Sequence, residues 1–379
     1  MSTKHIAVCL EHRFYEYKGN LYTKLSFSYA YWKDYLSFFD KVTVIARAQK
    51  VEKLDSGMVL VTGENVNYES LPYYLGLKQF ILKFIPLFLV ILKISFKYKY
   101  FLLRSGNSTN ILAFILIFLN KPYLREYPGN IEEGIIGFAG SSLKVRILAK
   151  FLNFIAKIQG RFSRANSFVS TYCQILYGSQ KPSYIFSSFK QSEITEFKKN
   201  YDIGKKLKVI TLGRLEGEKG HINLLKAIAA QNISLFELHI IGDGGQRENL
   251  ENFSKKHNID VKFYGSITNR EQIFTLLANA DVFVIPSLTE GMPRALLEAM
   301  AVGVPCIGSN VGGIPEVLAS ELLYEANNIK GLQDLLAKMY ESKDFRLDTA
   351  AKNQKVITDL YSDEVLQAKK HEFWSQVYE

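Results

Sequence analysis

The first half of the chain alternates short apolar runs with longer amphipathic stretches. The runs are rich in Val, Ile and aromatic residues, which indicates strands, and the stretches between them are long enough for helices. Strands that are apolar on both faces are typical of parallel sheets covered by helices. The pattern predicts strands at 5–10, 41–47, 98–104 and 122–129, and helices after Pro72 and over 107–119.

The same alternation restarts at Lys208. It predicts strands at 208–214, 235–244, 261–267, 281–287 and 304–309, and helices at 221–231, 246–258, from Arg270 and at 293–302. A polar stretch at 187–206 separates the two halves. The expected fold class is therefore α/β, with two Rossmann-like domains that face each other across a cleft. We assign residues 1–186 to an N-terminal domain, 187–361 to a C-terminal domain, and 362–379 to a helix that can pack against either, including back on the N-terminal one.

Glycine-bearing loops follow the strands of the second domain, where ligands of parallel sheets bind and where glycine lets the backbone approach a ligand. In GRLEGEKG, Arg214 and Lys219 flank a loop just before a helix, a place suited to a diphosphate. The alternative is a solvated loop with two exposed cations. The loop IIGDGGQ lacks the G-x-G-x-x-G form, which argues against an oxidoreductase. The loop residues that we single out as ligand-binding are Gly213, Gly242, Gly265, Ser266 and Gly291.

The stretch SLTEGMPRALLEAMAVGVP at 287–305 holds two glutamates eight positions apart. Pro293 suits the first helical position, and Met292 before it cannot cap, so the first-turn amides are left for another acceptor. Helical spacing turns Glu298 away from the apolar face. The alternative is a surface pair between Arg294 and Glu298, and the sequence permits both arrangements.

These loops, in this order and spacing, resemble the C-terminal domain of family 4 retaining glycosyltransferases, which have the GT-B fold. The match covers roughly residues 207–320 and rests on GRLEGEKG, IIGDGGQRENLE, VKFYGSI and the stretch with the two glutamates. The resemblance implies a nucleotide-diphosphate sugar as donor, with Arg214 and Lys219 on its diphosphate. It implies that Glu290 contacts the transferring sugar and that Glu298 accepts hydrogen bonds from the ribose.

The resemblance also assigns smaller roles. It implies that the backbone at Gly291 and Met292 meets phosphate or sugar, and that Tyr264, Gly265 and Ser266 border the nucleobase. The N-terminal domain matches only in its βα pattern and in the early loop at Gly19, as expected where acceptors differ.

The implied chemistry is transfer with retention through an oxocarbenium-like state, in which the leaving phosphate helps to deprotonate the acceptor. The resemblance implies no metal and no cofactor besides the donor, and the absence of any D-x-D sequence in the chain is consistent with a metal-independent enzyme. Many relatives place a histidine where this chain reads REYPGN. Here Arg125, Glu126 and Tyr127 occupy that place, and either one of them substitutes or His12 takes part.

The net charge of +10 is unevenly distributed, with the positive charge concentrated in the N-terminal half. Residues 1–186 hold 24 Lys+Arg against 11 Asp+Glu, a net +13. Such a half can bind nucleic acid or an anionic membrane. Two segments free of acidic residues, 77–104 and 143–164, interleave Lys and Arg with Phe, Leu and Ile, which favours the membrane surface over nucleic acid. The uncharged run Phe84 to Leu92 is too short to span. The alternative is two core helices whose lysines snorkel to solvent.

The three cysteines show no metal or disulfide spacing, which fits a reducing compartment, and the N-terminus is too short in its apolar part for a signal peptide. We expect a cytoplasmic protein, peripheral on the inner face of the plasma membrane.

The expected function is a hexosyltransferase that adds one sugar to a lipid-linked or membrane-proximal glycan of a surface polysaccharide. Two alternatives stay open: a sugar-nucleotide epimerase of the same architecture, and a non-catalytic partner subunit.

Overall fold

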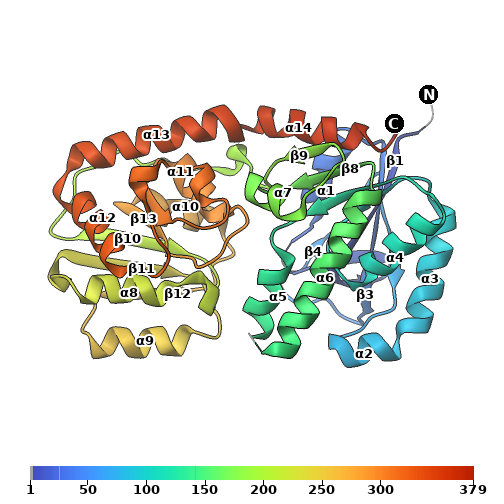
Figure 1. The fold of residues 1–379 in the computed structure, drawn as a ribbon, viewed down its shortest axis with the longest axis horizontal. Coiled ribbons are helices and arrows are strands. Elements are labelled where there is room, and N and C mark those ends of the chain that lie inside the picture. Colours follow the sequence, from blue (N-terminus) through green and yellow to red (C-terminus); the bar gives the residue numbers. More distant parts are fainter. Residues whose placement is uncertain (1–2, 25, 141) are drawn as a thin grey trace.

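The computed structural model describes residues 3–24, 26–140 and 142–379. Two α/β domains lie side by side, each built on its own twisted sheet (Figure 1). The predicted fold class is confirmed. Within each domain the strand order reverses beside the first strand, as in doubly wound nucleotide-binding folds, so the carboxyl ends of the strands form the edge where ligands bind.

The N-terminal sheet has the order β5-β3-β1-β6-β7-β8-β9; the short strand β2 pairs with the last residues of β1, and β4 pairs with β2. Its strands are β1 (His5–Tyr17), β2 (Asn20–Thr23), β3 (Lys41–Lys50), β4 (Val59–Leu60), β5 (Val66–Leu71), β6 (Phe101–Leu103), β7 (Tyr123–Tyr127), β8 (Ala165–Phe168) and β9 (Ser183–Ile185). Its helices are α1 (Tyr29–Leu36), α2 (Gly76–Leu82), α3 (Phe84–Lys97), α4 (Asn107–Phe118), α5 (Ile131–Ala139), α6 (Leu143–Phe162) and α7 (Thr171–Tyr177).

The first strand is longer than its sequence predicts. We expected a loop after residue 10, but β1 continues to Tyr17, because its second half pairs with β3 and forms a hairpin with β2. The two-residue turn, Lys18 and Gly19, has positive φ at both positions (46° and 76°). This geometry matches the right-handed twist of a hairpin and favours glycine.

The C-terminal sheet is entirely parallel, in the order β12-β11-β10-β13-β14-β15. Its strands are β10 (Leu207–Leu212), β11 (Phe236–Ile241), β12 (Val261–Gly265), β13 (Val282–Ile285), β14 (Cys306–Ser309) and β15 (Leu323–Tyr324). Its helices are α8 (His221–Ala229), α9 (Arg247–Lys256), α10 (Arg270–Ala278), α11 (Arg294–Val302), α12 (Ile329–Glu341) and α13 (Lys343–Tyr361). Short 3-10 turns lie at Gln191–Glu193, Gly217–Lys219, Ile233–Leu235, Ile314–Glu316 and Ser320–Leu322.

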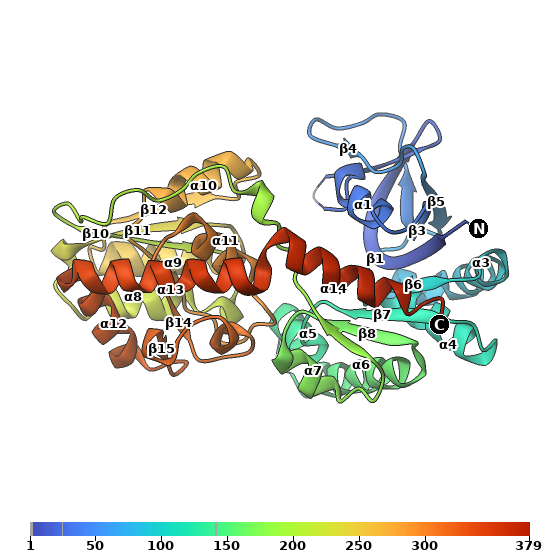
Figure 2. The same cartoon turned by 90° about the horizontal axis from the view of Figure 1, so that it is seen from above.

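The last two helices link the domains. α13 packs against α11 and α12, whereas α14 (Asp363–Ser375) crosses to the N-terminal domain and packs on β8 and β9 (Figure 2). Trp374 is buried there beside Tyr35, with the ring centroids 4.8 Å apart, and Lys370 pairs with Asp34 at 2.6 Å. Helix α14 therefore contributes to the core of the N-terminal domain through Phe373 and Trp374.

None of the helices in the described residues is by itself long and apolar enough to cross a membrane. Helices α2 and α3 together reach that length and composition, but they are bent by 70° where they meet. Leu87 and Ile91 of α3 are fully buried in the domain core, in the same cluster as residues of α4 and β1.

Candidate donor site between the domains

Loops at the carboxyl ends of the C-terminal strands pack tightly on one another. A Cβ atom at Gly242 would lie 1.8 Å from the carbonyl oxygen of Gly213, and one at Gly312 would lie 1.8 Å from that of Glu290. No side chain fits at either distance. Glycine at 242 and 312 therefore lets the loops after β10 and β11, and those after β13 and β14, approach closely enough to form one surface.

Lys219 and Glu290 meet at the centre of this surface. Lys219 Nζ lies 2.6 Å from Glu290 Oε1, and the hydroxyl of Ser287 donates to the same oxygen at 2.7 Å. The Glu290 side chain is only 9% exposed. Because both bonds go to Oε1, the second carboxylate oxygen is the one left for a ligand. The fold thus brings together two residues that lie 71 positions apart.

Arg214 lies at the rim. Its guanidinium bonds to Glu218 Oε1 at 3.0 Å, and its side chain is 62% exposed, so it can turn toward a ligand at little cost. The other oxygen of Glu218 is buried without a hydrogen-bond partner. Glu218 also lies close to α5 of the N-terminal domain, 3.1 Å from where a Cβ at Gly137 would stand.

The second glutamate of the spaced pair is buried, contrary to the prediction that it points away from the packed face of its helix. Glu298 is 3% exposed, and its carboxylate binds Arg270 Nη2 at 2.6 Å and Arg294 Nε at 2.8 Å. Arg270 comes from α10, so a neighbouring helix covers the face that periodicity assigns to solvent. Of the two arrangements of Arg294 that the sequence permits, the structure has the pair with Glu298.

Helix α11, which contains Glu298, begins one residue later than predicted. Pro293 is the N-cap of α11 and not its first helical residue, and no side chain caps it. Met292 receives a hydrogen bond on its sulfur from the Tyr361 hydroxyl, 3.8 Å away. A Cβ at Gly291 would lie 3.0 Å from Val169 and 3.2 Å from Gly129 of the N-terminal domain. This loop is therefore where the two domains touch beside the site.

The remaining predicted ligand-binding residues are spread more widely. Gly242 N donates to the carbonyl of Gly265 at 2.9 Å, which ties two of the loops together, and Ser266 next to it is exposed. Gly19 lies in the β1–β2 turn, where a Cβ would have no atom within 4 Å. The turn conformation alone accounts for that glycine.

Sequence reasoning missed His221, the first residue of α8 directly after the Lys219 loop. Its ring is 4% exposed, and its Nδ1 is buried without a hydrogen-bond partner. Burial, with a smaller effect from the Lys219 charge, lowers the pKa of His221 to about 4. The imidazole is therefore neutral at pH 7. The sequence could have pointed to His221 because it begins a helix directly after a loop of the kind that binds phosphate.

The N-terminal domain presents Glu126 at the carboxyl end of β7. Its carboxylate lies 3.3 Å from Arg104 Nε and accepts a bond from the Tyr35 hydroxyl at 3.4 Å. The other members of the REYPGN segment serve the fold, because Arg125 donates to two backbone carbonyls and the Tyr127 hydroxyl to a third.

His12, the alternative, is a partly buried residue that hydrogen-bonds Thr23 at 3.1 Å. Burial, with the nearby Arg13 and Arg47 charges, lowers its pKa to about 4. Among the four residues that the sequence suggested in place of the relatives' histidine, Glu126 is the only one with a carboxylate side chain.

Two contacts close the domains on each other near the site. Glu316 accepts the backbone N–H groups of Thr171 and Tyr172 at 2.8 and 2.7 Å, and so caps the N-terminus of α7 from the other domain. The Thr289 hydroxyl donates to Glu133 of α5. The second bond holds the loop of Glu290 against the N-terminal domain, and the first does the same for the 3-10 turn Ile314–Glu316.

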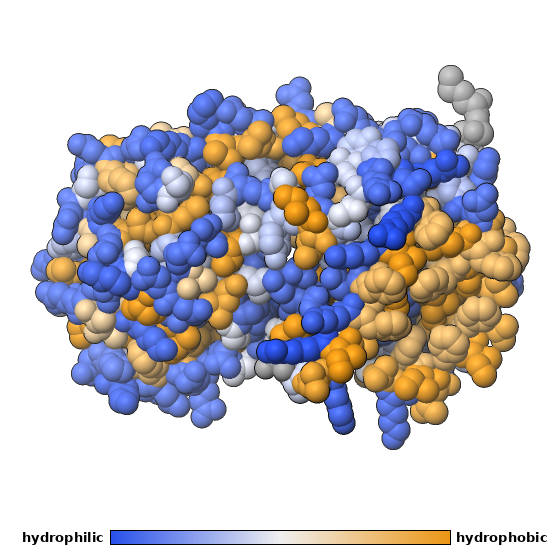
Figure 3. All heavy atoms as spheres, viewed as in Figure 1, coloured by the Kyte–Doolittle hydropathy of each residue, from blue (hydrophilic) through white to orange (hydrophobic). Residues whose placement is uncertain are grey.

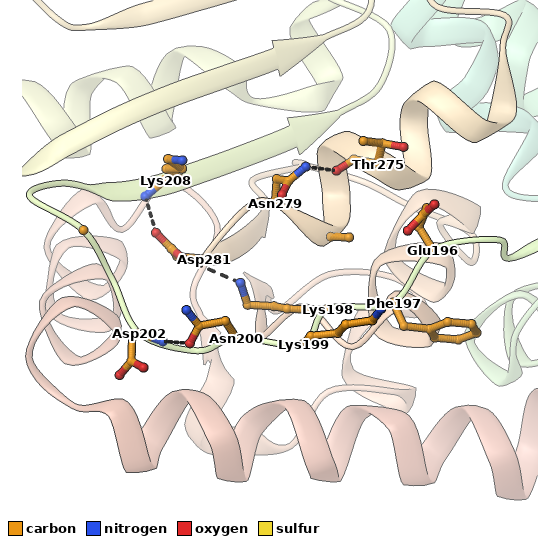
Figure 4. Close-up of a pocket in the computed structure, with 12 residues that line it drawn as sticks. Glu196, Phe197, Lys198, Lys199, Asn200, Asp202, Lys208, Thr275, Asn279 and Asp281 are labelled. Carbon is orange, nitrogen blue, oxygen red and sulfur yellow. Dashed lines mark hydrogen bonds and ion pairs between the residues drawn. The ribbon is translucent and has the colours of Figure 1, made fainter.

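A separate hollow of about 420 Å³ lies at the opposite edge of the C-terminal sheet (Figure 4). Lys198 and Asp281 face each other there, 3.6 Å apart, and the backbone N–H of Lys208 donates to Asp281 at 2.9 Å. Lys208 and Asp281 lie at the amino ends of β10 and β13, and Lys198 lies in the segment that precedes β10. Ligands of such sheets bind at the other edge. Within the described residues, no group of three or more His, Cys, Asp or Glu side chains is placed to hold a metal ion.

Comparison with known proteins identifies the family. Residues 193–356 match the model of "Glycosyl transferases group 1", and the chain is 30% identical to Protein CapJ of Staphylococcus aureus over 90% of its own length and 88% of that protein's. The chain belongs to the group 1 glycosyltransferases. A shorter match, 37% over 122 residues and 30% of each chain, is to the amylovoran biosynthesis glycosyltransferase AmsK of Erwinia amylovora.

Solved structures agree on the fold of this glycosyltransferase. Sucrose-phosphate synthase from Thermosynechococcus elongatus superposes with a TM-score of 0.75 at 16% identity, covering 99% of both chains. HepE from Anabaena, solved with UDP and glucose, gives 0.71 at 15% identity, covering 98% of this chain and 99% of that one. The fold is therefore GT-B, as the resemblance implied.

Proposed function

We propose that this glycosyltransferase is a retaining hexosyltransferase that moves one sugar from a nucleotide-diphosphate sugar to a lipid-linked or membrane-proximal glycan. The observation that carries the proposal is the contact between Lys219 and Glu290 at the carboxyl edge of the sheet. It provides a cation for a diphosphate and a carboxylate for sugar hydroxyls within 2.6 Å. HepE, a neighbour in fold, holds UDP and glucose, which supports this class of donor.

In the proposed reaction the bond between the sugar's anomeric carbon and the diphosphate oxygen breaks. Arg214 and Lys219 offset the charge that develops on the leaving phosphate, so that no metal or other cofactor is needed. Glu290 Oε2 accepts a hydrogen bond from a sugar hydroxyl. The acceptor hydroxyl attacks the oxocarbenium-like carbon on the face that the phosphate leaves, and its proton passes to the departing phosphate oxygen.

Glu298 has a narrower role than a free carboxylate would have. Oε1 already accepts bonds from both arginines, and Oε2 accepts one from Arg270 Nη1 at 3.3 Å. A carboxylate offers about four acceptor positions, so one on Oε2 remains for a ribose hydroxyl. We propose that the arginines orient Glu298 for that single bond.

The names of the relatives support a role in surface polysaccharide synthesis, because AmsK is named for amylovoran biosynthesis and another relative, WcaL of Salmonella typhimurium, for colanic acid. A peripheral position at the cytoplasmic face of the membrane would bring such an enzyme to a lipid-linked acceptor. The basic N-terminal half is consistent with that position.

The test combines the purified protein with a panel of nucleotide-sugars and a polyprenyl-diphosphate-linked acceptor. We expect a product one sugar larger by mass spectrometry, with the anomeric configuration of the donor by NMR. Glu290→Ala should lower turnover by about 10²-fold, the order found when one transition-state contact is removed. The matched control is Glu248→Ala, an exposed glutamate on α9. Isomerised donor without transfer would favour the epimerase, and equal donor hydrolysis by Glu290→Ala and wild type, without product, would refute the proposal.

A further inference from the structure

Helix α6 has its amphipathic pattern reversed. The residues that face the domain core are small or polar: Ala149, Asn153, Ala156, Gln159 and Gly160. The large apolar side chains lie on the outer face, where Ile147, Phe151, Phe154 and Phe162 are each 57% or more exposed. A helix of a soluble domain normally turns such a stripe inward. This arrangement excludes, for α6, the alternative of a core helix with snorkelling lysines.

Neighbouring helices extend the same surface. α2 and α3 expose Leu77, Ile81, Leu82, Ile85 and Leu89 at 58 to 72%, and α4 ends in Phe118 at 89%. α3 packs on α4, and α4 on α6, so the exposed side chains belong to one continuous layer of helices. The space-filling view shows the apolar area over the lower right of the molecule, with long hydrophilic side chains along its border (Figure 3). We name the outer faces of α2, α3, α4 and α6 the helical face.

The charges of the helical face are all positive. Between residues 70 and 125, and again between 134 and 192, the chain contains no Asp or Glu. Lys78, Lys93, Lys144 and Lys150 are exposed on these helices, and Lys83 is exposed between α2 and α3. Among the described residues none of these five forms an ion pair, whereas Lys97, the last residue of α3, pairs with Glu69. Lysines that border an apolar stripe are placed for lipid phosphates while the aromatic rings enter the interface.

We propose that the helical face is the surface on which this protein lies on an anionic lipid bilayer. The binding is interfacial and not spanning, because the buried stripe of α3 holds that helix to the domain and the α2–α3 pair is bent. A protein partner would also accept the apolar stripe, but a run of unpaired lysines without a single acid fits a surface whose charge is uniformly negative.

The helical face adjoins the donor site. α6 follows α5, whose Gly137 lies against Glu218 and whose Glu133 accepts from Thr289 of the Glu290 loop. A bilayer under α6 would therefore present lipid-linked molecules beside the contact of α5 with the loops of Glu218 and Glu290. This inference deepens the proposed function by naming how the acceptor is met. Its test requires no turnover, so it can fail while the transfer assay succeeds.

The experiment is flotation of the full-length protein with vesicles of phosphatidylcholine and phosphatidylglycerol (3:1), compared with pure phosphatidylcholine. We expect flotation only with the anionic vesicles, and less of it in 0.5 M salt. The double variant Phe151→Ser, Phe154→Ser should bind about tenfold more weakly, because two rings leave the interface. Both side chains are exposed, so the fold should be kept, which circular dichroism checks. The matched control is Phe197→Ser, Leu360→Ser, two exposed apolar side chains of the C-terminal domain at 52% and 45%.

Three results would overturn the proposal. The wild type stays at the bottom of the gradient with anionic vesicles, or the double variant floats like the wild type. Alternatively, lipid-free protein self-associates in sedimentation and the double variant is monomeric, which would make the helical face an interface between copies of this chain. Lys150→Gln with Lys157→Gln should reproduce the weaker binding to anionic vesicles, and an unchanged affinity there would also count against it.

Discussion

Lowering the pH from 7 to 5 should destabilise the C-terminal domain through His221. The pKa of this buried imidazole is about 4, whereas an unfolded histidine titrates near 6.5. Between these values the unfolded chain binds more protons than the folded one, so stability falls as the pH falls. For one group with these two pKa values, the loss between pH 7 and pH 5 is about 2 kcal/mol. Because the ring is 4% exposed, solvent screening does not reduce this figure appreciably.

The assay compares wild type with His221→Gln, which cannot take up the proton. Both tryptophans, Trp32 and Trp374, are buried in the N-terminal domain, so tryptophan fluorescence follows that domain and far-UV circular dichroism follows both. Between pH 7 and pH 5 the free energy of unfolding in urea should fall by about 2 kcal/mol more in the wild type than in the variant. This difference should appear when unfolding is followed by dichroism and not when it is followed by fluorescence. The same pH dependence in both proteins would refute the assignment of a neutral, buried His221.

Three further predictions concern the site and the domain link. Glu290→Gln should raise the affinity for a nucleoside diphosphate a few-fold, measured by calorimetry, because Lys219 loses a competing negative charge, yet transfer should slow; weaker nucleotide binding would contradict this. Glu126→Gln should lower kcat for transfer and leave nucleotide affinity unchanged, since Glu126 lies in the other domain; a change in nucleotide affinity alone would place it elsewhere. Trp374→Ala should destabilise the N-terminal domain by about 3–5 kcal/mol in urea unfolding, and a shift below 1 kcal/mol would show that α14 is not part of that core.

Much of the second domain could be predicted from sequence, because its signals are local. Buried parallel strands are continuous apolar runs, and glycine marks the loops where backbones approach. Lys219 and Glu290 could be assigned to one site without knowing the contact between them, since both follow strands whose carboxyl ends share an edge. Less of the N-terminal domain could be predicted. The hairpin at residues 11–23 was missed because strands with alternating polar residues resemble loops in composition.

The features that could not be predicted depend on contacts with residues that are distant in the sequence. Glu298 is buried because Arg270, on another helix, covers it, and helical periodicity contains no information about that helix. The same limit applies to α6. Its sequence left two interpretations open, a helix on a membrane surface and a core helix with snorkelling lysines, because helical spacing alone does not say what covers the apolar stripe. Only the packing of Ala156 and Gly160 against the domain shows that the phenylalanines point outward.

The site is built as a set of exchangeable ion pairs. Each cation proposed for the diphosphate already has a carboxylate, Arg214 with Glu218 and Lys219 with Glu290. A diphosphate at the proposed site would compete with these carboxylates, which would lower the net gain from each charge contact. In the proposed donor complex Glu290 keeps the bond from Ser287 to Oε1, and Oε2 accepts a hydrogen bond from a sugar hydroxyl. The proposed function therefore implies that the carboxylate paired with Lys219 is also the one that orients the sugar, which would couple diphosphate binding and sugar positioning through one side chain.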